Sequence, residues 1–202
     1  FEVSNINICK GVAMMNIQST KRLLTIIALL IVIASCTSTP SHFDQKLDES
    51  GKPQWVVQGT QTSKSQLGRS FLGVGVAQTN GEFSRQASAA NQRAKEELER
   101  MVERFIEVVS RDYLASGSAQ PSGYRENEAA LQVIEMTDIV IPNAKIMEHW
   151  VDHDDDKIFA IAEIDYPQVV SLLSSSSKVN PGFKSYLQSS GEQVFDRIAR
   201  QH

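Results

Sequence analysis

The sequence predicts an α+β fold: an antiparallel sheet of about four strands packed against one long and one shorter helix, with an extra C-terminal helix. Three patterns lead to this prediction. Apolar residues recur at intervals of three and four over residues 84–114, which indicates a long amphipathic helix. Residues 146–151 and 158–165 alternate on either side of an acidic stretch, as two strands of a hairpin do. The apolar run 70–79 indicates a further strand.

The N-terminal stretch KRLLTIIALLIVIASC, residues 21–36, has the order of parts of a secretory signal peptide. Lys21 and Arg22 precede an apolar run from Leu23 to Ala34, which is 12 residues long. A membrane-spanning helix needs roughly 20 apolar residues, so this run is too short. A buried core helix is the other alternative, but no polar residue recurs at helical spacing to form a wet face. We therefore expect residues 1–35 to be a signal peptide region.

The end of this stretch, Ile33-Ala34-Ser35-Cys36, resembles the box at which bacterial lipoproteins are processed. The resemblance implies cleavage before Cys36 and acylation there, because a thiol is the most nucleophilic side chain available to accept a diacylglycerol. Two or more acyl chains would form a stable membrane anchor. The next residue is Thr37 and not the Asp that retains lipoproteins at the inner membrane, so the resemblance implies a lipid-anchored protein of the outer membrane.

Residues 1–13 lie before Met14 and Met15 and lack both a basic start and an apolar pattern. We expect that they are not translated. Cys9 would then be absent from the product, and Cys36 would be its single cysteine, modified by lipid. A chain of this kind forms no internal disulfide.

The charge of the chain argues against two classes of partner. The full sequence has 20 basic and 24 acidic residues; without residues 1–35, which include Lys10, Lys21, Arg22 and Glu2, 17 basic and 23 acidic residues remain, a formal charge of −6. The densest basic stretch mixes Arg and Lys with Glu, as a solvated helix face does. We therefore expect neither nucleic-acid binding nor electrostatic binding to anionic lipid.

The N-terminal part of the mature chain is expected to be a lipidated tether followed by two strands. Residues 36–52 are polar and have no apolar period, which is typical of a flexible tether. Residues 53–59, PQWVVQG, suggest a short strand that opens with a proline. Residues 70–79, SFLGVGVAQT, suggest the second strand.

The helix over residues 84–114 begins with alanines and continues with larger apolar residues. We expect the alanine end to lie close against the sheet, over Gly73 and Gly75. A coiled coil is the alternative, but its spacing lasts only about two heptads, fewer than a convincing one has. The sequence leaves open whether the chain forms an oligomer through this helix. The remaining elements expected are a break at 116–123, a helix over 124–136, the hairpin, a helix from Pro167, a linker at 174–177, and a final helix over 183–200 interrupted or weakened by Gly191.

His149, Asp152 and His153 are the candidates for chemistry, as a metal site or a His-Asp pair. A periplasmic hydrolase or metal-binding protein built on them is the alternative function. A catalytic set also needs a nucleophile or an oxyanion hole, and the sequence marks neither near them. In a hairpin, His149 and Val151 share one face and His153 lies at the turn, so exposed or partly packed histidines are favoured.

The acidic stretch also matches part of a calcium-binding loop. Asp152, Asp154, Asp156 and Glu163 fall at positions 1, 3, 5 and 12. The glycine required at position 6 is Lys157, and the residues after it alternate as a strand does. A hairpin turn with solvated acids is favoured.

Gly73 and Gly75 form a GxG pattern like that of a dinucleotide-binding loop. The third glycine position is Gln78, and no helix begins there, so the pattern is weak. Glycines in a strand that admit a close helix are favoured.

Taken together, these segments resemble the Lpp-twenty family of small bacterial outer-membrane lipoproteins. The resemblance covers about residues 53–166. It implies an α+β core and an outer-membrane location, with relatives that serve around the flagellar basal body, and it brings no catalytic residues. It rests on Pro53-x-Trp55, FLGVGVA at 71–77, the helix with Ala87, Ala90, Arg93, Ala94 and Leu98, and the pair AKIMEHWVD and KIFAIAEID.

The sequence thus predicts four parts: the signal region 1–35, a lipidated tether 36–52, an Lpp-twenty-like domain 53–176 and a C-terminal helical tail 177–202. We expect a non-enzymatic envelope protein, without cofactor or metal. Its expected partners are the membrane, through the anchor on Cys36, and an envelope protein.

Overall fold

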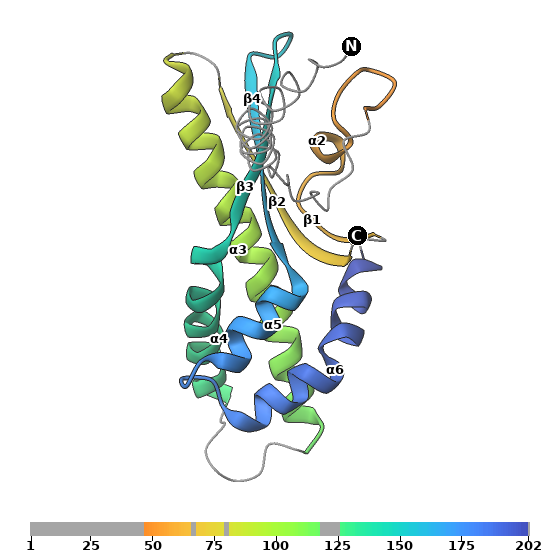
Figure 1. Cartoon of the computed structure of the whole chain (residues 1–202), viewed down its shortest axis with the longest axis vertical. Helices are drawn as coiled ribbons and strands as arrows, with labels where there is room; N and C mark the ends of the chain where they lie inside the picture. The colour runs from red at the N-terminus through yellow and green to blue at the C-terminus, as the bar shows by residue number, and fades with distance from the viewer. Residues whose placement is uncertain (1–46, 66–67, 79–80, 118–125, 202) are drawn as a thin grey trace, which may run out of the picture. The chain divides into compact units, whose positions relative to one another are not determined.

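The computed structural model describes residues 47–65, 68–78, 81–117 and 126–201. The elements in chain order are α2 (Gln54–Gln58), β1 (Gln61–Ser65), β2 (Gly68–Gln78), α3 (Phe83–Ala115), α4 (Glu126–Val140), a 3-10 turn (Ile141–Asn143), β3 (Lys145–Asp152), β4 (Lys157–Asp165), α5 (Tyr166–Ser175) and α6 (Pro181–Ala199). The strands form one antiparallel sheet in the order β1-β2-β4-β3. The predicted α+β fold class, with four antiparallel strands against a long helix, is confirmed (Figure 1).

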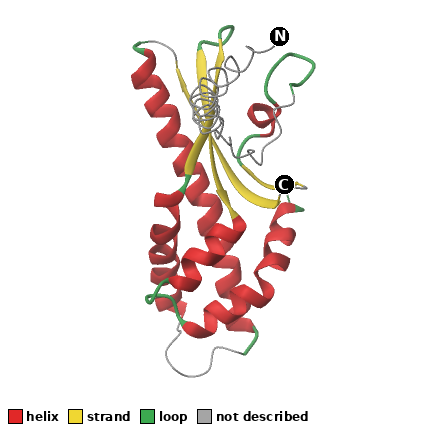
Figure 2. Ribbon diagram, in the orientation of Figure 1, coloured by secondary structure: helices red, strands yellow, loops and turns green. Residues whose placement is uncertain are grey.

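The domain has one part dominated by the sheet and one part made of helices (Figure 2). α3 belongs to both, because its N-terminal half lies on the sheet and its C-terminal half contacts α4 and α6. No described helix combines the length and the hydrophobicity that crossing a bilayer requires.

The predicted hairpin of β3 and β4 is confirmed. Val151 pairs with Ile158 and Asp152 with Lys157, so a four-residue turn joins the strands. Asp156 in this turn has a φ of 51°, a left-handed conformation that aspartate tolerates better than most residues. The register shifts between Ile146 and Glu148, which places a bulge in the edge strand.

The close contact of α3 with β2 depends on two glycines, as predicted. A Cβ on Gly73 would lie 2.2 Å from the carbonyl oxygen of Ala94. A Cβ on Gly75 would lie 2.2 Å from the backbone nitrogen of Ala94. Ala90 and Ala94 are fully buried. Because Gly73 and Gly75 have no side chains and the facing side chains of α3 are small, the helix backbone rests directly on the strand.

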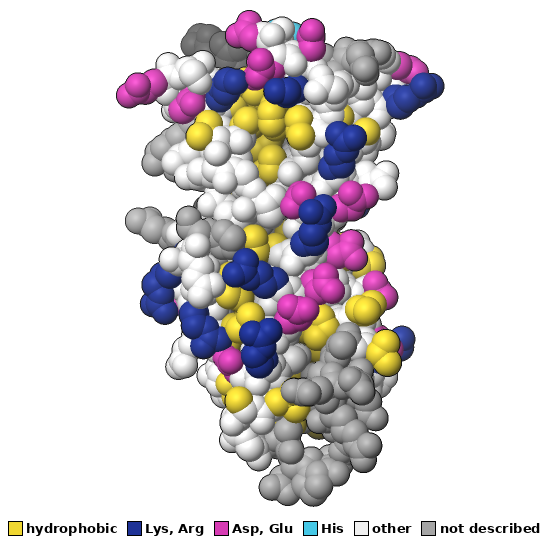
Figure 3. Space-filling model, turned by 180° about the vertical axis from the view of Figure 1, so that it is seen from behind, with side chains coloured by type: hydrophobic (Ala, Val, Ile, Leu, Met, Phe, Trp, Pro, Cys, Tyr) yellow, Lys and Arg dark blue, Asp and Glu magenta, His cyan; other side chains and the backbone are white. Residues whose placement is uncertain are grey.

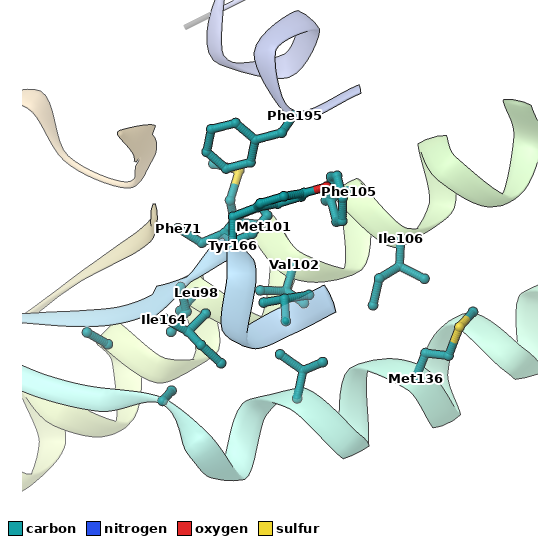
Figure 4. Close-up of a cluster of buried hydrophobic side chains, with 14 of the residues drawn as sticks. Phe71, Leu98, Met101, Val102, Phe105, Ile106, Met136, Ile164, Tyr166 and Phe195 are labelled. Atoms are coloured by element: carbon teal, nitrogen blue, oxygen red, sulfur yellow. The ribbon is translucent and has the colours of Figure 1, made fainter. Parts of the chain in front are cut away.

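The C-terminal half of α3 enters an aromatic core. Phe105 of α3, Phe71 of β2, Tyr166 of α5 and Phe195 of α6 meet in it, with ring centroids 5.0 to 6.5 Å apart (Figure 4). α4 adds Met136 to the same buried cluster. Five elements, β2, α3, α4, α5 and α6, thus share one core, and residues 181–199, expected as part of a tail, belong to it.

The strand predicted at residues 53–59 is wrong, because this segment contains the helical turn α2. Pro53 precedes the turn with a φ of −55°, and Gly59 ends it with a φ of 69° and an N–H that bonds to the carbonyl of Trp55. A short apolar run does not distinguish a strand from a helical turn by periodicity alone. The fourth strand is instead β1, whose sequence QTSKS has no apolar residue and was not predicted.

The expected interruption of the last helix at Gly191 is also wrong, since α6 is continuous. Gly191 is buried, and a Cβ there would lie 2.6 Å from the hydroxyl of Tyr166. The glycine allows α6 to approach α5, and this packing outweighs its low helix propensity. Asn180 caps the helix by accepting hydrogen bonds from the N–H groups of Gly182 and Phe183.

The other helices agree with the sequence apart from their ends. α4 runs four residues beyond Met136, to Val140, and α5 includes the first two serines of the expected linker. The coiled-coil alternative for α3 does not hold within the domain. Its seam residues Ala94, Leu98, Met101 and Phe105 are buried in the core of the same chain.

Candidate functional site

Cys36, the predicted lipidation site, lies outside the described residues. The described chain begins at Leu47, 11 residues after it.

Residues 47–52, which composition assigns to the tether, form a turn. Leu47 and Pro53 make an isolated antiparallel bridge. The Asp48 carboxylate accepts hydrogen bonds from the Ser50 hydroxyl and from the N–H groups of Lys52 and Ser50, which lower the pKa of Asp48. The structured part of the chain thus starts before Pro53.

Lys52 fastens this turn to the hairpin. Its Nζ donates to Asp152 Oδ2 at 2.8 Å and lies 5.8 Å from the centroid of the Trp150 ring. The Asp152 side chain is 4% exposed. The hydrogen bond from Lys52 lowers the pKa of Asp152 and, in return, raises the pKa of Lys52. Both side chains therefore stay charged near neutral pH.

The sheet face opposite α3, called the α2 face below, has its own small hydrophobic cluster. Trp55 of α2 is 2% exposed and packs with Leu72 of β2 and Ile161 of β4. α2 is only five residues long and covers this face in part. Five more apolar residues are partly buried around the cluster: Val56, Val74, Met147, Trp150 and Phe159.

The structure separates the three candidate residues for chemistry. His149 pairs with Ala160 and points to α3, where its Nε2 lies 2.6 Å from Asn91 Oδ1. Asp152 bonds to Lys52 on the α2 face, and His153 is exposed in the turn. His149 and Asp152 therefore lie on opposite faces of the hairpin, and the three side chains do not form one site.

The acidic turn has the hydrogen bonding of a hairpin turn. Asp152 Oδ1 accepts from the N–H groups of Asp154 and Asp155 at 3.2 and 3.3 Å. Glu163 lies at the far end of β4, paired with Leu72 and Lys145. The described residues contain no group of three or more His, Cys, Asp or Glu side chains placed to hold a metal ion. The GxG pattern of Gly73 and Gly75 offers no space for a dinucleotide on this face, because the backbone of α3 fills the space above both glycines.

An open groove of about 660 Å³ lies between α5 and α6. Tyr166 is one of the residues that line it, and burial, followed by the charge of Glu192, raises the pKa of Tyr166 to about 12. Tyr166 is therefore protonated at neutral pH and cannot act as a base. The lining residues include no histidine that would activate a serine: Tyr166, Pro167, Val170, Ser171, Ser174, Ser175, Gln188 and Glu192.

A network of charges joins α6 to the sheet. Asp196 accepts two hydrogen bonds from Arg69 of β2, at 2.8 and 3.2 Å, and one from Lys64 of β1 at 2.9 Å. Glu192 adds a salt bridge to Arg69 at 3.3 Å. The hydrogen bonds from Arg69 and then Lys64 hold the pKa of Asp196 far below its usual range. These ion pairs join α6 to β1 and β2, so we interpret the network as structural.

We expect Asp196→Asn to lower the free energy of unfolding at pH 7 by about 1–2 kcal/mol, because the charge-assisted bonds to Arg69 are lost. A carboxylate whose pKa is lowered in the folded state stabilises it above the unfolded pKa of about 4, and this contribution is lost as the pH falls through the folded value. The difference in stability between the wild type and the variant, measured by urea unfolding, should therefore begin to shrink below about pH 4 and keep shrinking as the pH falls further. Asp155→Asn, in a more exposed pair with Lys157, is the control and should change stability by less than about 0.5 kcal/mol. A constant difference across this pH range would contradict the ion-pair assignment.

The face shown in Figure 3 carries Lys and Arg side chains interspersed with Asp and Glu, and hydrophobic side chains gather in its upper part.

No known protein-family model matches the sequence, and no curated protein matches it. Sequence reasoning missed the ion pair of Lys52 with Asp152 and the helical turn that carries Trp55. The proline before and the glycine after QWVVQ are the signal that indicates a helical turn there.

Proposed function

We propose that this chain is a lipid-anchored lipoprotein of a bacterial outer membrane that acts by binding other envelope proteins and not by catalysis. The observation that carries the proposal is the stretch from Lys21 to Cys36. It combines a basic start, a short apolar run and an Ile-Ala-Ser-Cys box, and each part has a separate physical role in export and acylation.

The described residues support the binding role in two ways. The histidines and Asp152 that would serve a hydrolase or a metal site lie apart, on opposite faces and in a turn. The chain that follows the tether leads directly into a turn and α2, which dock on the α2 face through Lys52 and Trp55. An anchor at Cys36 would therefore hold this face near the membrane.

A role near the flagellar basal body is part of the proposal only through the resemblance to the Lpp-twenty family. That resemblance rests on the order of short segments between residues 53 and 166 behind the lipobox. Loss of motility in a deletion strain that returns on complementation would support this part of the proposal.

Cys36→Ser is the direct test of the anchor. In bacteria labelled with radioactive palmitate, the wild type should be labelled and the variant should not, because serine lacks the thiol that accepts the diacylglycerol. Mass spectrometry should find the variant with its leader still attached, and the wild type in the outer-membrane fraction. Thr39→Ser, which lies after Cys36 and leaves the Ile-Ala-Ser-Cys box intact, is the matched control and should be labelled and sorted as the wild type is. Normal labelling of Cys36→Ser would overturn the proposal.

A further inference from the structure

We propose that the free edge of β2, from Gly73 to Gln78, binds an extended segment of a partner protein, which joins the sheet as an added strand. This inference rests on the proposed binding role and names the kind of partner and the surface. It is supported by the pairing of β2, by the side chains that bond to its edge and by the position of α3 over the strand.

The pairing of the strands leaves this edge open. β2 has 11 residues, but β1 pairs only with Gly68–Leu72. On its other side β2 pairs with β4 from Ser70 to Gln78. Among the described residues, no strand lies beside Gly73–Gln78 on the β1 side. At about 3.3 Å per residue this edge is roughly 20 Å long, enough for a short strand.

Side chains occupy the backbone groups that point outward from this edge. The N–H of Val74 donates to the Thr60 hydroxyl at 3.0 Å, and the carbonyl of Val76 accepts from the Arg93 guanidinium. In an antiparallel ladder, alternate residues direct both backbone groups to the same neighbour. Val74 and Val76 are therefore the positions where an added strand would bond, and its backbone would replace the contacts from Thr60 and Arg93.

The side chains beside the edge fit an apolar, alternating segment. Val76 is 38% exposed and Val57 on the neighbouring α2 is 60% exposed. Val74 is partly buried against the cluster of Trp55, Leu72 and Ile161. Every second side chain of an added strand would pack on this face, while main-chain hydrogen bonds supply affinity.

The helix over β2 favours a lone extended segment over a second copy of this chain. α3 rests directly on β2 at Gly73 and Gly75. Two copies paired through this edge would bring two such helices together over strands about 4.8 Å apart, whereas packed helices need 8–10 Å. A segment without a covering helix meets no such conflict. Arg93, released from Val76, would then be available to pair with an acidic residue of the segment.

The test uses the full-length chain, immobilised in detergent micelles, and a phage-displayed library of linear peptides about seven residues long. We expect enrichment of sequences with aliphatic residues at alternate positions and an acidic residue among them. Val76→Lys should weaken binding of the enriched peptides at least about ten-fold, because a charge at a strand edge opposes pairing. Leu131→Lys is the matched control on α4, where Leu131 is 71% exposed, and should bind as the wild type does.

Three outcomes would overturn the proposal: no enrichment of extended sequences, enriched peptides that bind Val76→Lys as well as wild type, or equal weakening by Leu131→Lys. A self-association in sedimentation that Val76→Lys abolishes, without peptide enrichment, would assign the edge to a second copy instead. Unchanged thermal unfolding of Val76→Lys shows that the fold is intact. Acylation of Cys36 is measured separately, so failure of the anchor and failure of the edge are distinguishable.

Discussion

Gly75→Ala is expected to lower the free energy of unfolding by about 3 kcal/mol or more, at or above the upper end of the usual cost of overpacking. The added Cβ would lie 2.2 Å from the backbone nitrogen of Ala94 and 2.3 Å from the carbonyl oxygen of Ala90. Both are backbone atoms of α3, and β2 is hydrogen-bonded to β4 within the sheet. Neither α3 nor β2 can therefore move away without breaking hydrogen bonds. Urea unfolding followed by circular dichroism measures the loss.

Gly81→Ala is the matched control for this substitution. A Cβ there would have a single neighbour, the Gln86 Nε2 at 3.1 Å, which is the end of a flexible side chain. We expect the free energy of unfolding to change by less than about 1 kcal/mol. Replacing glycine by alanine also reduces the entropy of the unfolded chain, which stabilises the fold by about 0.4–1 kcal/mol where no clash occurs. If Gly75→Ala were as stable as the wild type, α3 would not rest on β2 as described.

The parts of the fold with a strong period were predictable from the sequence. α3 has charges opposite a continuous apolar stripe over 33 residues, and β3 and β4 flank a polar turn. The glycines at 73 and 75 were interpretable because glycine in a strand has few uses other than close approach. In each of these cases the local pattern and the tertiary contacts favour the same structure.

Elements without such a period were not predictable. β1 is a polar edge strand that pairs with β2, and the hydrogen bond from Lys64 to Asp196 joins it to α6. α2 is a helical turn because Trp55 finds a pocket formed by Leu72 and Ile161, residues that a local window does not contain. Tertiary packing decides both structures, and propensity does not.

The candidate sites differ in the same way. Cys36 was found by a local motif that needs no fold, whereas Lys52 and Asp152 are 100 positions apart and meet only through the hairpin. The open edge of β2 is a property of strand lengths and register, which composition does not reveal. A charged pair in a turn and a free edge thus become visible only once the sheet is assembled.

Phe195→Ala should lower the free energy of unfolding by about 3–5 kcal/mol, the usual cost of removing a buried phenylalanine side chain. Phe195 is fully buried, and its ring centroid lies 5.0 Å from that of Phe71 and 5.4 Å from that of Tyr166. Figure 4 shows it entering the core from α6, above residues of β2, α3 and α5. The substitution would leave a cavity where α6 meets the sheet and α3, and rigid strands and helices collapse into it only in part.

The size of this effect decides whether residues 177–202 are a tail or part of the domain. A tail that folds separately would lose its own structure at low denaturant and leave the unfolding of the rest unchanged, which gives two transitions. Since Phe195 shares a core with Phe71 and Phe105, we expect one cooperative transition, shifted as a whole to lower denaturant. Phe83→Ala is the matched control, because Phe83 is 59% exposed at the start of α3 and its loss should cost less than about 0.5 kcal/mol. Equal effects of the two substitutions, or a separate early transition in Phe195→Ala, would show that α6 is not part of the core.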